Sequence, residues 1–348
     1  MIDALSKPFL AVNELESVKE LQKKGFEVEY VVVSKEIGDI NLILSQTAII
    51  HHIKISNIWD FTTLKLLFLF RKLKPDFLFS SVMYLNPRVI IASKLYNKKC
   101  GIIIRNCNTI KNLRCELKYL LRKTYVYADK IIAQQEEMAS EIVTQIPGTK
   151  EIVVTLFNPI DKELIDESCK GPSPYKDKNI IKIVWPARVS YVKGQDLLIK
   201  ALHILHRGGR LYHLYFLGRY NSNDKYYQSL VNLTHSYNLD NYVHFVGHQP
   251  NPYVWIKNSD CFVLPSRNEG LPNALLEAMY LKVPVVATKC IPVISRIVSV
   301  GTDGYLAETE NEQSLAECII QAVSLDIKTN NDFISDSSEF LKLFDYEK

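Results

Sequence analysis

Arg188 and Lys193 are the first pair of side chains whose types and spacing indicate chemistry. They lie five residues apart, directly after an apolar run at 183–185, and Gly194 follows before a predicted helix that starts at Leu197. Two cations at the end of a buried strand, facing the N-terminus of a helix, suit a diphosphate group. Taken singly, Arg188 could instead form a surface salt bridge, and Lys193 could be a solvated loop lysine.

A second segment, residues 269–277, carries two carboxylates around another predicted helix N-terminus. It follows a short apolar run at 261–264, and Pro272 suits the first helical position because its fixed φ matches a helix. The helix dipole and the free backbone N–H groups of this loop favour a phosphate. Glu269 and Glu277 could accept hydrogen bonds from sugar hydroxyls at two separate points. A helix start with one favourable acid and a surface glutamate would give the same pattern.

The elements around these residues alternate between strands and helices along the chain of 348 residues. This alternation predicts an α/β protein with two doubly wound, Rossmann-like domains that face each other across a cleft. We expect an N-terminal domain over 1–160 and a C-terminal domain over 179–325. A Pro-, Gly- and Ser-containing linker would join them at 161–178. Residues 326–348 would form a C-terminal helix that returns to the first domain, whose opening strand is expected to be short or missing.

These motifs together resemble the family 4 glycosyltransferases, which are retaining enzymes with the GT-B fold. The resemblance covers roughly residues 125–325 and is carried by Arg188, Lys193, Glu269 and Glu277. It is also carried by the segments Ala128-Asp129-Lys130-Ile131-Ile132-Ala133, Asn158-Pro159-Ile160-Asp161, Phe245-Val246-Gly247-His248 and Pro284-Val285-Val286-Ala287-Thr288.

The resemblance implies that the N-terminal domain binds the acceptor and that the C-terminal domain binds the nucleotide-sugar donor. In the donor site, Arg188 and Lys193 would clamp the donor diphosphate, Glu277 would hold the ribose and Glu269 the transferred sugar. Arg188, Lys193 and Glu269 are therefore the expected catalytic residues. The backbone of Gly270, Leu271, Pro272 and Asn273 would approach sugar and phosphate, and Val246 and Gly247 would contact the base edge. Arg296 departs from the family pattern, because it stands where a glutamate is expected.

The implied reaction is retaining transfer of a sugar, expected from a UDP-sugar, to an acceptor hydroxyl. The donor phosphate can serve as the local base, so neither a metal nor another cofactor is expected. The acceptor would be a glycan or a polyprenyl-linked sugar in bacterial polysaccharide or lipid-linked glycan synthesis. Two alternatives stay open: a degenerate or truncated protein that binds a nucleotide-sugar or a partner without turnover, and a nucleotide-sugar epimerase of the same fold.

Three polar residues follow a predicted strand end in the N-terminal half. Arg105, Asn106 and Asn108 come directly after the apolar run at 102–104 and could contact ligands in the cleft. Loop-capping asparagines would give the same pattern.

The charge of the chain is uneven although its net value is only +4. Residues 61–123 hold 14 Lys or Arg against 2 Asp or Glu, and a basic helix is predicted over 112–123. Its leucines at 113, 117, 120 and 121 share one side, so it could lie in an anionic lipid surface, or pack on its own domain. Binding of nucleic acid is not expected, because the basic region lacks interleaved aromatic residues. With no signal peptide or apolar span evident, we expect a cytoplasmic protein attached to the inner face of the membrane.

Overall fold

The computed structural model divides the chain into two compact units, which we describe separately. Unit 1 comprises Met1–Asp161 and Ser335–Lys348, and unit 2 comprises Lys162–Ile334. The structure describes residues 2–3, 21–34, 49–55, 61–107, 109–111, 113–158, 160–177, 179–327 and 342–343. The predicted C-terminal helix over 326–348 therefore lies almost entirely outside the described residues.

Unit 1 is built on a fully parallel sheet with strand order β3-β2-β1-β4-β5-β6-β7. Its strands are β1 (Ile2–Asp3), β2 (Glu29–Ser34), β3 (Ile49–Lys54), β4 (Phe77–Ser80), β5 (Gly101–Asn106), β6 (Lys130–Ala133) and β7 (Val153–Thr155). The opening strand has only two residues, yet it lies in the centre of the sheet, where Ile2 pairs with both Val31 and Ser80. Residues 4–20, which follow this strand, lie outside the described residues, so the short or missing first strand stays a prediction.

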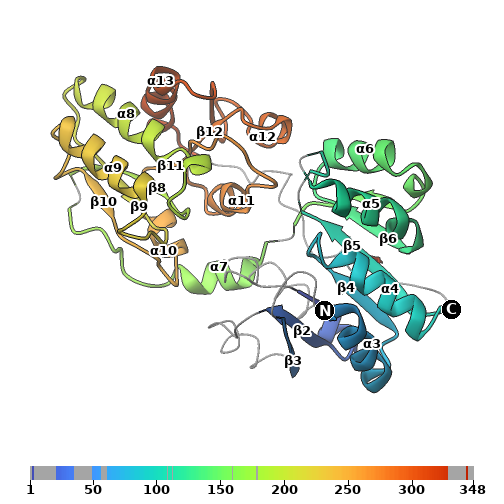
Figure 1. The fold of residues 1–348 in the computed structure, drawn as a ribbon. Coiled ribbons are helices and arrows are strands. Elements are labelled where there is room, and N and C mark those ends of the chain that lie inside the picture. Colours follow the sequence, from blue (N-terminus) through green and yellow to red (C-terminus); the bar gives the residue numbers. More distant parts are fainter. Residues whose placement is uncertain are drawn as a thin grey trace. The chain divides into compact units, whose positions relative to one another are not determined.

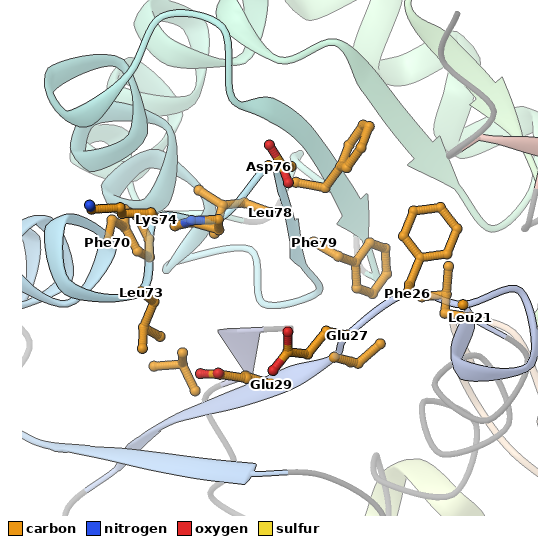
Figure 2. A pocket seen from close by; sticks show the side chains of 15 residues that line it. Leu21, Phe26, Glu27, Glu29, Phe70, Leu73, Lys74, Asp76, Leu78 and Phe79 are labelled. Carbon is orange, nitrogen blue, oxygen red and sulfur yellow. The ribbon is translucent and has the colours of Figure 1, made fainter. Parts of the chain in front are cut away.

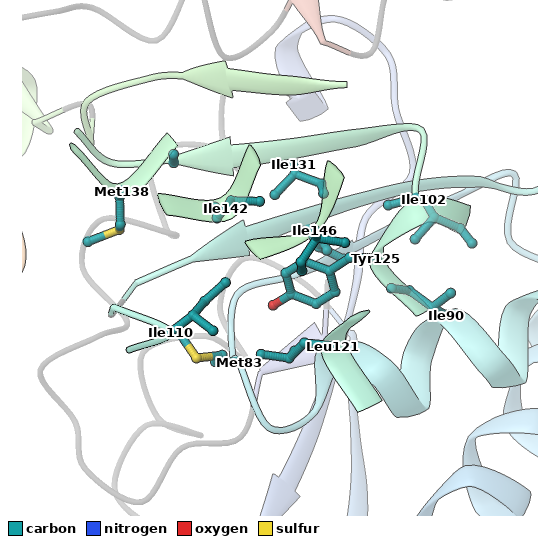
Figure 3. Close-up of a cluster of buried hydrophobic side chains, with 13 residues drawn as sticks. Met83, Ile90, Ile102, Ile110, Leu121, Tyr125, Ile131, Met138, Ile142 and Ile146 are labelled. Atoms are coloured by element: carbon teal, nitrogen blue, oxygen red, sulfur yellow. The ribbon is translucent and has the colours of Figure 1, made fainter. Parts of the chain in front are cut away.

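Helices α3 (Thr62–Leu73), α4 (Asn86–Tyr96), α5 (Cys115–Thr124) and α6 (Glu136–Gln145) pack along this sheet, with short 3₁₀ turns η2 (Tyr125–Tyr127) and η3 (Pro147–Thr149) (Figure 1). Alternate strand residues face opposite sides, as the pleat requires. Ile102, Ile104 and Ile131 point to the cluster around Leu121 and Tyr125 that Figure 3 shows. Ile103 and Ile132 point to the other side, where Leu21 and Leu343 pack against the sheet.

Unit 2 contains a second parallel sheet with strand order β10-β9-β8-β11-β12-β13. Its strands are β8 (Ile181–Trp185), β9 (Tyr212–Phe216), β10 (Val243–Phe245), β11 (Cys261–Leu264), β12 (Val285–Thr288) and β13 (Gly304–Ala307). Its helices are α7 (Lys162–Ser168), α8 (Gln195–His206), α9 (Lys225–Ser236), α10 (Tyr253–Lys257), α11 (Asn273–Tyr280), α12 (Pro292–Ile297) and α13 (Glu312–Ala322), with a 3₁₀ turn η4 (Tyr191–Lys193). The predicted linker therefore includes a helix, α7, whose Asp166 accepts a hydrogen bond from Tyr280.

A cavity of about 370 Å³ lies in unit 1, around the starts of β2 and β4 (Figure 2). Its lining includes Phe26, Glu27, Glu29, Lys74 and Asp76. Ligands of doubly wound sheets bind beyond the carboxyl ends of the strands, and this cavity lies toward the opposite ends. The functional site is therefore expected outside this cavity.

Candidate functional site

The switch point of the unit 2 sheet lies between β8 and β11, which pair through Ile183 with Cys261 and Val184 with Phe262. From β8 the sheet continues through β9 to β10, and from β11 it continues through β12 to β13. Connections therefore leave these two central strands in opposite directions, and the carboxyl ends at such a point are where doubly wound sheets bind their ligands. The loop after β8 carries Arg188 and Lys193, and the loop after β11 carries Glu269.

Lys193 and Glu269 form an ion pair between these two loops. The Lys193 ammonium donates to both carboxylate oxygens of Glu269, at 2.7 and 2.8 Å. The Ser266 hydroxyl also donates to Oε1 of Glu269, at 2.6 Å. The carboxylate side chain is 8% exposed and the lysine side chain 24%. The structure thus brings together two of the three residues that the sequence assigned to catalysis, and it pairs them with each other.

Gly194 allows the two loops to touch. Its φ is +66°, in the left-handed region, and a Cβ atom on it would lie 2.0 Å from the carbonyl oxygen of Pro265. A side chain at this position is therefore excluded both by backbone conformation and by space. The indole N–H of Trp185 donates to the carbonyl of Lys193 at 3.1 Å, which fixes the same loop from the strand side.

The side chain of Arg188 is exposed, whereas contacts with neighbouring residues hold its main chain in place. Its carbonyl accepts a hydrogen bond from the buried Gln195 amide at 2.9 Å. The neighbouring Gly218 leaves so little space that a Cβ atom on it would lie 1.7 Å from the carbonyl oxygen of Ala187. The guanidinium of Arg188 is therefore available to an anion from solvent, while its main chain is held in place.

Helix α11 begins one residue later than predicted. Pro272, expected as the first helical residue, is the N-cap, with a non-helical ψ of 80°, and Asn273 opens the helix. The physical reason is that the Pro272 carbonyl already accepts a bond from the first turn, from the Leu275 N–H at 2.9 Å, while its own backbone is not yet helical. Gly270 and Leu271 lie in the loop just before this N-terminus, as predicted.

Glu277 lies in the second turn of α11 and is only partly exposed. Burial raises its pKa to about 7, and the Tyr253 hydroxyl, which donates to Oε1 at 3.4 Å, opposes that rise. Val246 and Gly247 follow β10 at the same end of the sheet. The Val246 N–H donates to the Phe216 carbonyl at 3.0 Å, and Gly247 has a φ of +83°. Arg296, which replaces the expected glutamate, is exposed on α12.

The sequence interpretation missed a second ion pair between the same two loops. The Arg267 guanidinium donates to both carboxylate oxygens of Asp196, each at 2.7 Å, and to the Tyr191 carbonyl at 2.7 Å. It also lies 3.8 Å from the centre of the Tyr191 ring. The available signal was opposite charges on both loops: Lys193 and Asp196 on one, Arg267 and Glu269 on the other.

Of the cleft contacts predicted in unit 1, Arg105 and Asn106 are buried. Asn106 is fully buried and accepts from the Tyr125 hydroxyl at 3.0 Å. Arg105 is 4% exposed, donates to Asn158 at 3.3 Å and lies over the Phe79 ring. These side chains bond to the turn η2 and to the segment after β7 within unit 1. That they contact a ligand stays a prediction. Asn108 lies outside the described residues.

The basic helix α5 differs from the prediction in its first residue, and it follows the predicted alternative of packing on its own domain. It begins at Cys115 rather than at 112, and its leucine side is directed inward. Leu121 is completely buried, and Leu113 and Leu117 pack against the same cluster. These leucines therefore contribute to the domain core, so they are not available to enter a lipid surface. Within the described part of the chain, no helix has the length and apolar character needed to span a membrane.

Comparisons with known proteins agree with this architecture. The chain is similar to Anabaena HepE, solved in complex with UDP, with a TM-score of 0.77 and 18% identity, covering 93% of this chain and 91% of that one. It is also similar to the lipopolysaccharide outer core galactosyltransferase WaaB in its apo form, with a TM-score of 0.69 and 17% identity, covering 99% and 96%.

Relatives in sequence carry related descriptions. An uncharacterized glycosyltransferase of Methanocaldococcus jannaschii is 30% identical over 253 residues, which are 67% of this chain. An N-acetylgalactosaminyltransferase of Campylobacter jejuni, which acts on N-acetylgalactosamine-N,N'-diacetylbacillosaminyl-diphospho-undecaprenol, is 26% identical over 65% of this chain. The chain covers 61% of the length of each of these two relatives.

A capsular polysaccharide biosynthesis glycosyltransferase of Staphylococcus aureus, CapM, is 25% identical over 75% of this chain. The family model for glycosyl transferases group 1 matches residues 169–339, the region that holds both loops of the candidate site. The chain therefore has the two-domain GT-B fold of glycosyltransferases, and residues 169–339 match group 1 of these enzymes.

Proposed function

We propose that this protein is a retaining glycosyltransferase of the family 4 type, which transfers a hexose from a UDP-sugar to an acceptor hydroxyl. The observation that carries the proposal is the placement of two cations after β8, at the switch point of unit 2. Arg188 is exposed there, and Lys193 is paired with Glu269 of the loop that leads into α11. Two cations beside a helix N-terminus suit a diphosphate.

In the proposed complex, the donor diphosphate binds Arg188 and Lys193. Glu269, released from part of its ion pair, accepts hydrogen bonds from hydroxyls of the transferred sugar. Glu277 accepts from the ribose, and the backbone of Val246 and Gly247 contacts the base. The two cations stabilise the charge that develops on the departing diphosphate. The donor phosphate takes the proton of the attacking hydroxyl, so the proposal requires neither a metal nor another cofactor.

The acceptor in this proposal is a glycan or a polyprenyl-linked sugar at the cytoplasmic face of the cell membrane. Support comes from the names of two relatives, one acting on a diphospho-undecaprenol-linked sugar and one in capsular polysaccharide biosynthesis. An acceptor anchored in lipid requires that the enzyme come to the membrane. The proposal therefore includes peripheral contact between region 61–123 and anionic lipid.

Helix α3 offers a better surface for that contact than α5. Its buried residues Thr62, Leu66, Leu67 and Phe70 cover one side of the helix. On the opposite side Phe61, Leu64 and Phe68 are 76%, 46% and 66% exposed. Lys65, Arg71 and Lys72 surround them, and α3 contains no acidic residue. A solvated helix face is normally polar, and aromatic residues among cations suit the interface of an anionic membrane.

A product assay tests the catalytic proposal. Purified protein is incubated with a panel of UDP-sugars and polyprenyl-diphosphate-linked acceptors, and the anomeric configuration of the product is determined by NMR. Transfer with retained configuration supports the proposal, and inversion contradicts its mechanism. UDP binding without transfer to any acceptor favours the degenerate binding protein. A donor converted to its epimer without acceptor favours the epimerase.

Vesicle co-sedimentation tests the membrane contact separately. The protein should bind vesicles with 30% phosphatidylglycerol at low salt and dissociate as salt rises, because each basic residue near the surface contributes about 1 kcal/mol. Substitution of Phe61 and Phe68 by Ser should lower the bound fraction about fivefold. Ile320→Ser, at a 49% exposed position of unit 2, is the matched control. Equal binding by the double variant and the control would exclude α3.

A further inference from the structure

Two ion pairs join the loops of the candidate site in a reciprocal way. The loop after β8 contributes a cation, Lys193, to an acid on the other loop, Glu269. The loop after β11 contributes a cation, Arg267, to an acid at the start of α8, Asp196. Each loop therefore gives one positive and one negative partner. Only the first pair consists of residues that the proposed function places against the donor.

The Arg267 pair is the more extensively bonded of the two. Besides Asp196 and Tyr191, the guanidinium contacts Glu310 on the segment after β13, at 2.5 Å from Nε. The Arg267 N–H donates to the Val192 carbonyl at 2.8 Å, so main chain and side chain both hold the turn η4. The Arg267 side chain is 11% exposed. Bidentate, charge-assisted contacts of this kind fix geometry as well as adding energy.

Asp196 is held in its ionised form by this arrangement. Burial alone would raise its pKa, but hydrogen bonds from Arg267 and from the Tyr226 hydroxyl, with the charge of the guanidinium, lower it below its ordinary value. The Tyr226 hydroxyl lies 2.6 Å from Oδ1 of Asp196. Helix α9 is thereby connected to the same pair. The contacts of Arg267 and Asp196 thus connect four segments: η4 with the start of α8, the loop after β11, α9 and the segment after β13.

We propose that Arg267 is a positioning residue. It keeps Lys193 within reach of the donor diphosphate when that diphosphate replaces Glu269 as the partner of Lys193. This inference rests on the proposed donor site. When an anionic diphosphate binds, Lys193 must share or leave Glu269, and the first pair stops joining the loops. Arg267 then remains as the connection, because its partners Asp196, Tyr191 and Val192 are not residues assigned to the donor. Arg267 acts through Lys193 and does not itself touch the donor.

A double-mutant cycle distinguishes this role from a general effect on folding. Calorimetry measures UDP affinity for the unmodified protein, Arg267→Gln, Lys193→Ala and the double variant. We expect Arg267→Gln to weaken UDP binding about tenfold, since small displacements of a positioned group are costly. In the Lys193→Ala background the same change should have less than a twofold effect, because the residue through which it acts is already absent. Arg267→Lys should recover part of the affinity.

Lys182→Gln provides a matched control. Lys182 and Asp260 form an ion pair at 3.0 Å, which joins the same two strands, β8 and β11, at their opposite ends. Its loss should lower the melting temperature and leave UDP affinity unchanged. If Arg267→Gln weakens UDP binding equally with and without Lys193, the positioning role is overturned while the donor site stands. If the unmodified protein does not bind UDP, the donor site is refuted, and this inference with it.

Discussion

The carboxyl ends of the two parallel sheets use polar residues in opposite ways. In unit 1, Arg105 is 4% exposed and Asn106 is completely buried, and both bond to other side chains of the same unit. In unit 2, Arg188 is exposed and Lys193 lies in an ion pair that an anion could replace. Polar residues at the carboxyl ends of strands in two similar folds therefore serve cohesion in one case and, in our proposal, ligand binding in the other. Residue type at a strand end does not distinguish these uses, whereas burial and bonding do.

The strongest test of this comparison removes Glu269, the acid at the proposed reacting centre. Glu269→Ala should lower kcat about 100- to 1000-fold, the scale observed when one preorganised transition-state contact is lost. Its effect on the affinity for UDP, which has no sugar for Glu269 to hold, should be small. Steady-state kinetics and UDP calorimetry separate the two effects. A large loss of UDP affinity with normal turnover would reverse the roles that we assign.

Arg105→Ala tests the cohesive side of the comparison. Removing this buried side chain leaves a cavity beside Phe79 and deletes the contact to Asn158. We therefore expect the free energy of unfolding to fall by about 3 kcal/mol. Urea denaturation gives this value, and UDP affinity serves as the control readout, because the residue lies in the other unit. Unchanged stability together with weaker UDP binding would show that Arg105 belongs to a ligand site after all.

Arg188→Ala is the counterpart in unit 2. The exposed guanidinium contributes little to folding, so the melting temperature should not change. UDP binding should weaken by about 1.5–3 kcal/mol, the range of hydrogen bonds to charged groups. Because the contact is ionic, the difference between variant and unmodified protein should shrink as salt rises. An affinity that is unaffected at low salt would remove Arg188 from the site.

The pH dependence of the free energy of unfolding tests the burial of Glu277, another polar residue of unit 2. Burial raises its pKa to about 7 in the folded protein, so the folded state holds a proton that the unfolded chain has lost above about pH 4.5. This group therefore stabilises the fold fully at low pH, and the stabilisation is lost as pH rises through about 7. With allowance for its partial exposure, we expect a decline of roughly 1–2 kcal/mol between pH 5 and pH 8. In Glu277→Gln the decline should disappear; if it persists, other groups cause it.

Local patterns in the sequence were sufficient to predict the strands around the site and the loops that carry Arg188, Lys193 and Glu269. The bonding between these residues was not predictable, because partners such as Asp196 and Arg267 lie 71 positions apart and meet only through strand pairing. Leu121 illustrates a second limit. Its amphipathic helix fits a membrane surface and a protein core equally well, and only tertiary packing decides between them. The Pro272 boundary differed by one residue, because a proline suits both positions at a helix start.

The division of the chain bears on the order in which this protein folds as it is synthesised. Unit 2 is one continuous segment, Lys162–Ile334, whereas unit 1 takes its residues from both sides of it. Leu21 and Leu343 lie on the same side of the unit 1 sheet, more than 300 positions apart in the chain. Unit 2 can therefore form its core without any residue that lies beyond 334. Unit 1 must wait, with one side of its sheet incompletely covered, until the segment after residue 334 has emerged.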